Sequence, residues 1–296
     1  MRLNITKEFS LEVNGLDIAI IEYGDNKNPT LIALHGWLDN AASFALLAEL
    51  LPNYHIIAID LVGHGHSSHR GLNQPYYIWD NVMDLYLILQ ELNIEKADLL
   101  GHSMGASIVM LFAACFAEKV DKLILIEGFA PLSYPADKLP NLMAEAIQDR
   151  AKFIAKASAV KPSSVKSQRI KSFELLVKAR MNSLFSVTEQ AAKLLVARGA
   201  KLVNESYSWR SDGALMLPSI QRMSEEQIIA FLTSLKADTY IYLGDSGLSN
   251  NKWQEYFNHI PCKQVKVFSG NHHLHMHPQG AELIAKDIDR IFTHKL

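Results

Sequence analysis

The pentapeptide Gly101–Gly105 (GHSMG) places a serine between two glycines at the junction of two apolar segments. A short apolar run, Ala97–Leu100, precedes it, and Ala106–Phe116, with apolar residues at helical spacing, follows it. A sharp turn from strand to helix exposes the serine hydroxyl, and glycines on both sides avoid collisions with the neighbouring backbone. The pattern therefore predicts a nucleophile elbow with Ser103 as the nucleophile.

A serine nucleophile needs a general base, and the loop Ser269–Pro278 (SGNHHLHMHP) offers four histidines. Histidine titrates near neutral pH, so it suits this task. His272, the first after the Gly-Asn turn, is the expected base, and His273 is the alternative. A metal site is the rival interpretation of this loop. We expect no metal, because all of these ligands come from one loop without a nearby Cys, Asp or Glu cluster.

Two carboxylates could orient the base. Asp245 lies in a Gly-flanked turn after the apolar run Thr239–Leu243, and Glu127 ends an earlier apolar run. Both follow Ser103 and precede His272, as the chain order serine, acid, histidine requires. We favour Asp245, because a lone acid in a strand-end turn suits an orienting role, and Glu127 stays open as the alternative acid.

Acyl transfer also needs backbone N–H groups that stabilise a developing oxyanion. Met104, directly after the serine, is expected to supply one N–H group. The segment His35–Trp37 (HGW), at the end of the apolar run Leu31–Leu34, is expected to supply the other through Trp37. The glycine-rich segment Asp60–Ser67 is interpreted as structural, with its aspartate accepting backbone N–H groups.

Short runs rich in β-branched residues alternate with helical patterns and are expected to position these residues. The alternation predicts an α/β fold with a mostly parallel eight-stranded sheet flanked by helices. The first two runs, joined at Asn14-Gly15, are expected to form an antiparallel hairpin. The expected strands are Phe9–Val13, Asp17–Glu22, Thr30–His35, His55–Asp60, Ala97–Gly101, Lys122–Glu127, Thr239–Leu243 and Lys263–Phe268.

The alternation stops between about residues 129 and 236, where the pattern is largely helical. We therefore expect a core domain formed by residues 1–129 and 237–296, and a helical cap, residues 130–236, inserted after the sixth strand. The expected helices of the cap are Asn141–Ala157, Ser163–Asn182, Thr188–Ala197 and Ser224–Leu235.

Composition limits the classes of partner. The chain has 296 residues, 49% of them hydrophobic and 20% charged, as in ordinary globular proteins. A net charge of −2 gives no reason to expect binding to nucleic acid or an anionic membrane. Residues 1–13 lack the apolar stretch of a signal peptide, and no run is long enough to span a bilayer. We expect a cytoplasmic protein, and these patterns indicate no oligomeric state.

Taken together, these motifs resemble the α/β-hydrolase superfamily over nearly the whole chain. Within it, the segment Glu127–Pro131 (EGFAP) and the histidine-rich loop are similar to the serine hydrolase-like group. The resemblance implies a Ser103–Asp245–His272 triad under a helical cap. Since relatives can place the acid after either strand, Glu127 remains possible.

The resemblance also implies an activity. Similar members are often carboxylesterases that use an acyl-enzyme intermediate, with oxyanion donors at the positions of Trp37 and Met104. A serine nucleophile argues against the branches that attack with aspartate. The expected substrate is a small ester with an apolar portion, and no metal, nucleotide or other cofactor is expected. The alternatives are a C–C bond or thioester hydrolase with the same triad, or a ligand-binding protein on a hydrolase fold with little turnover.

Overall fold

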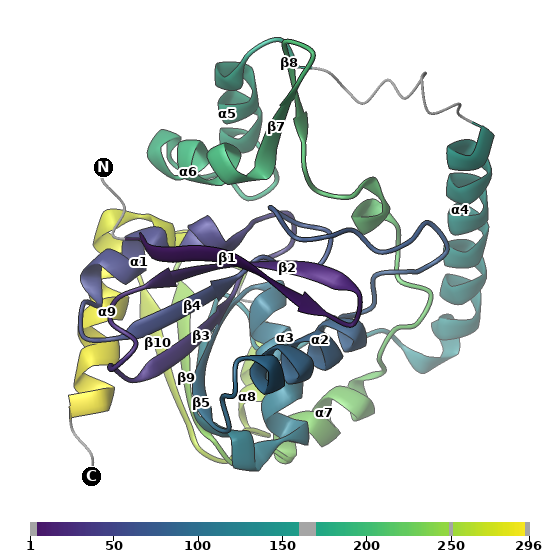
Figure 1. The fold of residues 1–296 in the computed structure, drawn as a ribbon. Coiled ribbons are helices and arrows are strands. Elements are labelled where there is room, and N and C mark those ends of the chain that lie inside the picture. Colours follow the sequence, from purple (N-terminus) through teal and green to yellow (C-terminus); the bar gives the residue numbers. More distant parts are fainter. Residues whose placement is uncertain (1–4, 160–169, 249–250, 294–296) are drawn as a thin grey trace.

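A computed structural model describes residues 5–159, 170–248 and 251–293 (Figure 1). Eight strands form one sheet in the order β1-β2-β4-β3-β5-β6-β9-β10, and each of the eight expected runs overlaps one of them, three runs extending one residue past the end of the strand. The sheet strands are β1 (Ile5–Val13), β2 (Leu16–Tyr23), β3 (Thr30–Leu34), β4 (His55–Ile59), β5 (Ala97–His102), β6 (Val120–Ile126), β9 (Asp238–Gly244) and β10 (Lys263–Phe268).

The pairing of the strands confirms a mostly parallel sheet. β1 and β2 form an antiparallel hairpin whose turn residues, Asn14 and Gly15, have φ angles of 51° and 74°, as the expected Asn-Gly turn requires. β2 is also antiparallel to β4, while the remaining pairs, from β4 to β10, are parallel. The carboxyl ends of the parallel strands therefore meet at one edge, where ligands bind in open α/β sheets.

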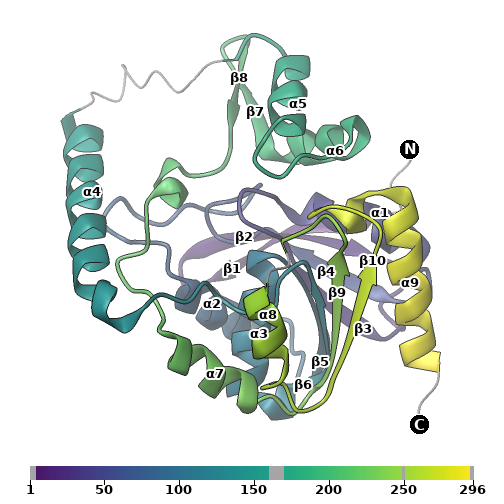
Figure 2. The same cartoon turned by 180° about the vertical axis from the view of Figure 1, so that it is seen from behind.

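Helices cover both faces of the sheet (Figures 1 and 2). The α-helices outside the inserted segment are α1 (Ala45–Leu50), α2 (Ile78–Glu91), α3 (Met104–Cys115), α8 (Asn251–Phe257) and α9 (Pro278–Thr293), and α7 (Glu225–Thr233) lies at the end of that segment. Successive residues of β3 alternate between two core clusters: Ile32 and Leu34 pack with α2, α3 and α7, and Leu31 and Ala33 pack with α1 and α9. Among the described residues, no helix is both long and apolar enough to cross a membrane.

The segment inserted between β6 and β9 contains helices and one feature that the sequence analysis missed. Its elements are α4 (Leu139–Ala159), α5 (Phe173–Met181), α6 (Glu189–Gly199), β7 (Ala200–Val203), β8 (Ser206–Trp209) and α7 (Glu225–Thr233). β7 and β8 form a hairpin between two of the expected helices, in a stretch for which no element was expected. Its turn residues, Asn204 and Glu205, both have positive φ, but the pair lacks the glycine that marks such turns in a sequence.

The inserted segment packs in two places. α5 and α6 form their own apolar cluster with the hairpin and with Met276 of the histidine loop, and Figures 1 and 2 show this group beside the sheet. α7 packs instead with α3 in the main core through Ile228 and Leu232, although the expected cap range includes it. The expected helix Ser163–Asn182 begins only at Phe173, and its first residues, 163–169, lie outside the described residues.

Candidate active site

Ser103 lies on a sharp turn between β5 and α3, as the pentapeptide predicts. Its φ of 52° and ψ of −114° are strained for a residue other than glycine. The two glycines explain how the turn is possible. A Cβ on Gly105 would lie 2.0 Å from the carbonyl oxygen of Leu34, and a Cβ on Gly101 would lie 2.4 Å from Cα of Ala106.

A chain of polar contacts leads from this serine to a buried acid. Ser103 Oγ lies 3.0 Å from His272 Nε2, and His272 Nδ1 lies 3.1 Å from Glu127 Oε2. A carboxylate only accepts hydrogen bonds, so Nδ1 carries the proton and Nε2 is free to accept from the serine. The structure thus brings together the expected serine, the expected base and the alternative acid.

Three donors hold the Glu127 carboxylate. Besides His272 Nδ1, the backbone N–H of Gly244 donates to Oε1 at 2.6 Å and that of Leu248 donates to Oε2 at 2.9 Å. Glu127 is 0% exposed, and a Cβ on Gly247 would lie 2.2 Å from its oxygens. The turn after β9 therefore forms a cradle around this carboxylate.

The structure does not bring Asp245, the preferred acid of the sequence analysis, into contact with His272. Asp245 is exposed, and its Oδ1 accepts hydrogen bonds from the N–H of Gly270 and from Ser246 Oγ, both at 3.1 Å. The hydrogen bond from Gly270 holds the pKa of Asp245 below its usual value. Asp245 thus stabilises the start of the histidine loop from outside, while the backbone of its own turn binds Glu127.

The loop after β3 lies against the serine and is held by two neutral histidines. His35 Nε2 accepts from the N–H of Leu61, and His64 Nε2 accepts from the N–H of Leu38. Burial lowers the pKa of His35, and burial together with the nearby His35 lowers that of His64 to about 3. A Cβ on Gly36 would lie 3.2 Å from Ser103 Cβ, so this loop and the elbow are in close contact.

The two expected oxyanion donors have free N–H groups. Within the described part of the chain, the backbone N–H groups of Trp37 and Met104 donate no hydrogen bond. The indole Nε1 of Trp37 donates to the carbonyl of Leu215 in the inserted segment at 3.1 Å. Its side chain therefore connects the loop to that segment and leaves the backbone N–H available.

Asp60 is structural, as the segment Asp60–Ser67 predicts. Its oxygens accept from the N–H groups of Ala41 at 2.7 Å and His66 at 2.6 Å. Arg198 of α6 also donates to both oxygens, at 3.0 and 2.8 Å. The carboxylate thus fixes two loops of the sheet edge and one helix of the inserted segment.

Asp39 and Arg180 form a second buried connection between the core and the inserted segment. Arg180 Nη2 donates to Asp39 Oδ1 at 2.7 Å, and His273 Nε2 lies 3.0 Å from Asp39 Oδ2. Burial favours a high pKa for Asp39, but His273, Arg180 and His102 together hold it well below its usual value. Arg180 also donates to the carbonyl of Phe185, whose ring centroid lies 4.2 Å from that of His272.

The candidate metal site among the described residues consists of Asp39, His102 and His273. One ligand atom each from Asp39, His102 and His273 lie within 4.8 Å of one another, and all three side chains are buried. Arg180 Nη2, however, lies 3.0 Å from His273 Nε2 and is hydrogen-bonded to the aspartate. A guanidinium thus occupies the place of a cation, and a metal ion would have to displace it.

The chain of polar contacts opens into a cavity of about 650 Å³. Its walls come from the loops after β3, β4 and β6 and from the inserted segment, and they are mostly apolar and aromatic. The lining includes Trp37, Tyr76, Trp79, Ser103, Met104, Tyr134, Phe185, Leu215, Arg222 and Trp253. Cavities of this size and composition bind small organic molecules.

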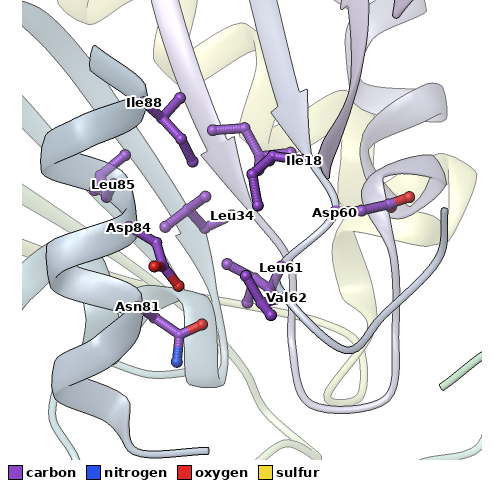
Figure 3. A pocket seen from close by; sticks show the side chains of 10 residues that line it. Ile18, Leu34, Asp60, Leu61, Val62, Asn81, Asp84, Leu85 and Ile88 are labelled. Carbon is purple, nitrogen blue, oxygen red and sulfur yellow. The ribbon is translucent and has the colours of Figure 1, made fainter. Parts of the chain in front are cut away.

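A second cavity, between β3, β4 and α2, is too small for a ligand (Figure 3). Its volume is about 10 Å³, close to the least that can hold one water molecule. Figure 3 shows Asn81 and Asp84 of α2 beside it, with Asp60 pointing away. Burial raises the pKa of Asp84 to about 6, although Arg70 opposes the rise. This cavity is a packing defect in the core, separate from the candidate site.

Sequence reasoning did not single out Asp39, Arg180 or Phe185. The sequence gives only a weak indication that Asp39 belongs to the site: it lies two residues after Trp37, the last residue of the HGW motif. Arg180 and Phe185 have none: they lie at the end of a helix and in the loop after it, and only the fold brings them to the histidine loop.

The elbow glycines give a stability prediction. Gly105→Ala should lower the free energy of unfolding by about 3 kcal/mol, because the added methyl group meets the backbone of β3. Urea denaturation of the two proteins measures the change. Gly71→Ala is the matched control, since its Cβ would meet only Gln74, at 3.6 Å, and should change stability by less than about 0.5 kcal/mol. Equal effects of the two substitutions would show that the elbow relaxes easily.

His275 gives a pH prediction. It is 0% exposed, neither ring nitrogen has a hydrogen-bond partner among the described residues, and burial, with nearby His273, lowers its pKa to about 3. Between about pH 6.5 and pH 3 the unfolded chain therefore binds this proton and the folded chain does not, so stability falls as the pH falls. His275→Met should reduce that decline by about 1.4 kcal/mol per pH unit.

Urea denaturation between about pH 6 and pH 4 tests this expectation. The exposed His277 provides the control: His277→Met should keep the pH dependence of the wild-type protein. An unchanged slope in the His275 variant would mean that this histidine is protonated in the folded protein.

The fold agrees with comparisons to known proteins. A family model described as "alpha/beta hydrolase fold" matches residues 29–277. A "Serine hydrolase-like protein" of Mus musculus is 28% identical over 291 residues, which cover 93% of this chain and 92% of that protein. A "Probable serine hydrolase" of Drosophila melanogaster is 30% identical over 282 residues, covering 91% of this chain and 83% of that protein.

Solved structures show the same fold. The crystal structure of a hypothetical protein from Pseudomonas aeruginosa PAO1 has a TM-score of 0.89 and 32% identity, and the match covers 98% of this chain and 100% of that one. A thioesterase domain from the curacin biosynthetic pathway has a TM-score of 0.81 at 23% identity, over 96% of this chain and 99% of that one, and shows the common fold. The chain belongs to the α/β-hydrolase fold family and, within it, to the serine hydrolase-like group.

Proposed function

We propose that this protein hydrolyses carboxylic esters through a serine acyl-enzyme. One observation carries the proposal: Ser103 Oγ, His272 and Glu127 form a continuous chain of contacts at 3.0 and 3.1 Å beside a cavity of about 650 Å³. A nucleophile, a base in hydrogen-bond reach and an acid that orients the base are the parts that acyl transfer by a serine requires.

In the proposed reaction, His272 Nε2 takes the hydroxyl proton as Ser103 Oγ attacks the ester carbonyl. Glu127, which accepts a hydrogen bond from the Nδ1–H group, holds the ring in the required tautomer and stabilises the imidazolium that forms. The imidazolium then gives its proton to the departing alcohol. A water molecule activated by His272 releases the acid and restores the serine.

The negative charge of the tetrahedral intermediate needs donors that are already in place. The free N–H groups of Trp37 and Met104 support this role, because each belongs to a segment that is fixed beside Ser103. The Trp37 segment is held by hydrogen bonds to neutral His35 and His64, and Met104 begins α3. At this helix end the dipole also favours negative charge.

We also propose that the inserted segment acts as the cap that sets substrate size. Trp37 binds Leu215, and Phe185 packs on the ring of His272, so cap residues form part of the cavity wall. The apolar lining favours esters with an apolar portion. α7, which packs in the main core, serves the sheet rather than the cap.

Substitution of the two carboxylates tests the assignment of the acid. Glu127→Gln should lower kcat for p-nitrophenyl esters by about 100-fold or more, because it removes the charge that stabilises the imidazolium. Asp245→Asn is the matched control and should change kcat by less than about 3-fold, since Asp245 does not contact His272. Equal losses in the two variants would contradict the assignment.

The nucleophile is tested with p-nitrophenyl esters from acetate to laurate. Ser103→Ala should lower kcat/KM by at least about 1,000-fold for every ester that the wild-type protein hydrolyses. Thermal denaturation of each variant separates loss of activity from loss of fold, and Glu127→Asp offers a second probe if Glu127→Gln unfolds. If the wild-type protein hydrolyses none of the esters faster than Ser103→Ala does, ester hydrolysis is refuted. A C–C or thioester substrate, or ligand binding without turnover, would then be favoured.

A further inference from the structure

Arg222 places a positive charge in the wall of the large cavity. It is the one lysine or arginine among the described residues that line this cavity, and Glu127 is the one acid among them. The Glu127 carboxylate is already bound by His272 and two backbone N–H groups, so it does not neutralise the guanidinium. The cavity therefore combines apolar walls with one cation.

The surroundings of Arg222 fix its orientation. Its Cζ lies 4.5 Å from the centroid of the Tyr134 ring, and its Nε donates to the carbonyl of Ser219 at 3.2 Å. The backbone of this segment is held as well, because the N–H of Tyr134 donates to the carbonyl of Met223 at 2.9 Å. A guanidinium held by stacking and by its Nε loses little entropy when its terminal nitrogens bind a ligand.

Arg222 differs from three arginines near the candidate site that are each paired with an aspartate. Arg70, Arg180 and Arg198 pair with Asp84, Asp39 and Asp60, respectively. Within the described part of the chain, no carboxylate lies within 4.0 Å of the nitrogens of Arg222. Its two terminal nitrogens are thus available for a planar, bidentate contact with an oxyanion.

We propose that Arg222 binds an anionic group of the substrate, a carboxylate or a phosphate, at the end of an apolar spacer from the scissile ester. The inference rests on the proposed ester hydrolysis and names the class of ester. The aromatic walls hold the spacer, and the guanidinium selects esters with a charged end over neutral esters of equal length.

Matched pairs of esters test the selectivity. The p-nitrophenyl monoesters of adipate and pimelate carry a terminal carboxylate, and the hexanoate and heptanoate esters have the same acyl chain lengths without it. The wild-type protein should show a higher kcat/KM for the charged member of each pair. Arg222→Gln should lower kcat/KM for the charged esters on the order of 10- to 100-fold and change that for the neutral esters by less than about 2-fold.

Two further variants are needed. Arg222→Lys keeps the charge but loses the planar fork, so it should retain part of the preference. Arg290→Gln, on α9 and outside the cavity, removes an exposed arginine and should leave the preference unchanged. If Arg222→Gln leaves the ratio of kcat/KM for charged esters to kcat/KM for neutral esters unchanged, the inference is overturned. Ester hydrolysis itself would still stand.

Binding tests the same contact without turnover. Calorimetric titration with pentanoate, butyl phosphate and 1-pentanol should show tighter binding of at least one anion than of the alcohol, and a loss of about 10-fold in that affinity in Arg222→Gln. The anion that binds more tightly identifies carboxylate or phosphate as the group. Equal affinities of the wild-type protein and Arg222→Gln for both anions would overturn the inference, even if no ester is hydrolysed and the proposed function fails.

Discussion

The candidate site depends on one fully buried carboxylate. An isolated charge is costly to bury, and Glu127 is stable there because His272 and two backbone N–H groups donate to it. Those backbone donors come from the last residue of β9 and from the turn after it, which approaches closely only because Gly247 has no side chain. The acid therefore fixes the turn and the histidine together, and its removal would leave three donors without an acceptor in the protein interior.

A second set of buried carboxylates joins the core to the inserted segment. Asp39 binds Arg180 of α5, and Asp60 binds Arg198 of α6. Breaking a buried ion pair leaves an uncompensated charge, so each pair favours the arrangement in which α5 and α6 lie on the sheet edge. Since Arg180 also holds the backbone of Phe185, the same contacts that position these helices complete the wall beside His272.

Much of this arrangement could be predicted from the sequence, because the strands and the nucleophile elbow can each be recognised from a short stretch of residues. Alternating apolar runs predict the eight strands, and the glycines around Ser103 predict its turn. The choice between Asp245 and Glu127 has no local signal, since both end a strand and occur in the required chain order. It depends on which side chain faces the histidine loop, and that follows from the three-dimensional path of the turn after β9.

The neutral ring of His102, beside His272, removes one obstacle to a positive charge on the base. Burial lowers the pKa of His35, His64, His102 and His275, so these rings carry no positive charge near neutral pH. A charged ring at the position of His102, whose centroid lies 4.9 Å from that of His272, would oppose protonation of the base. Because His102 stays neutral, it does not oppose the imidazolium of the proposed reaction, and Glu127 stabilises that imidazolium through its contact with Nδ1.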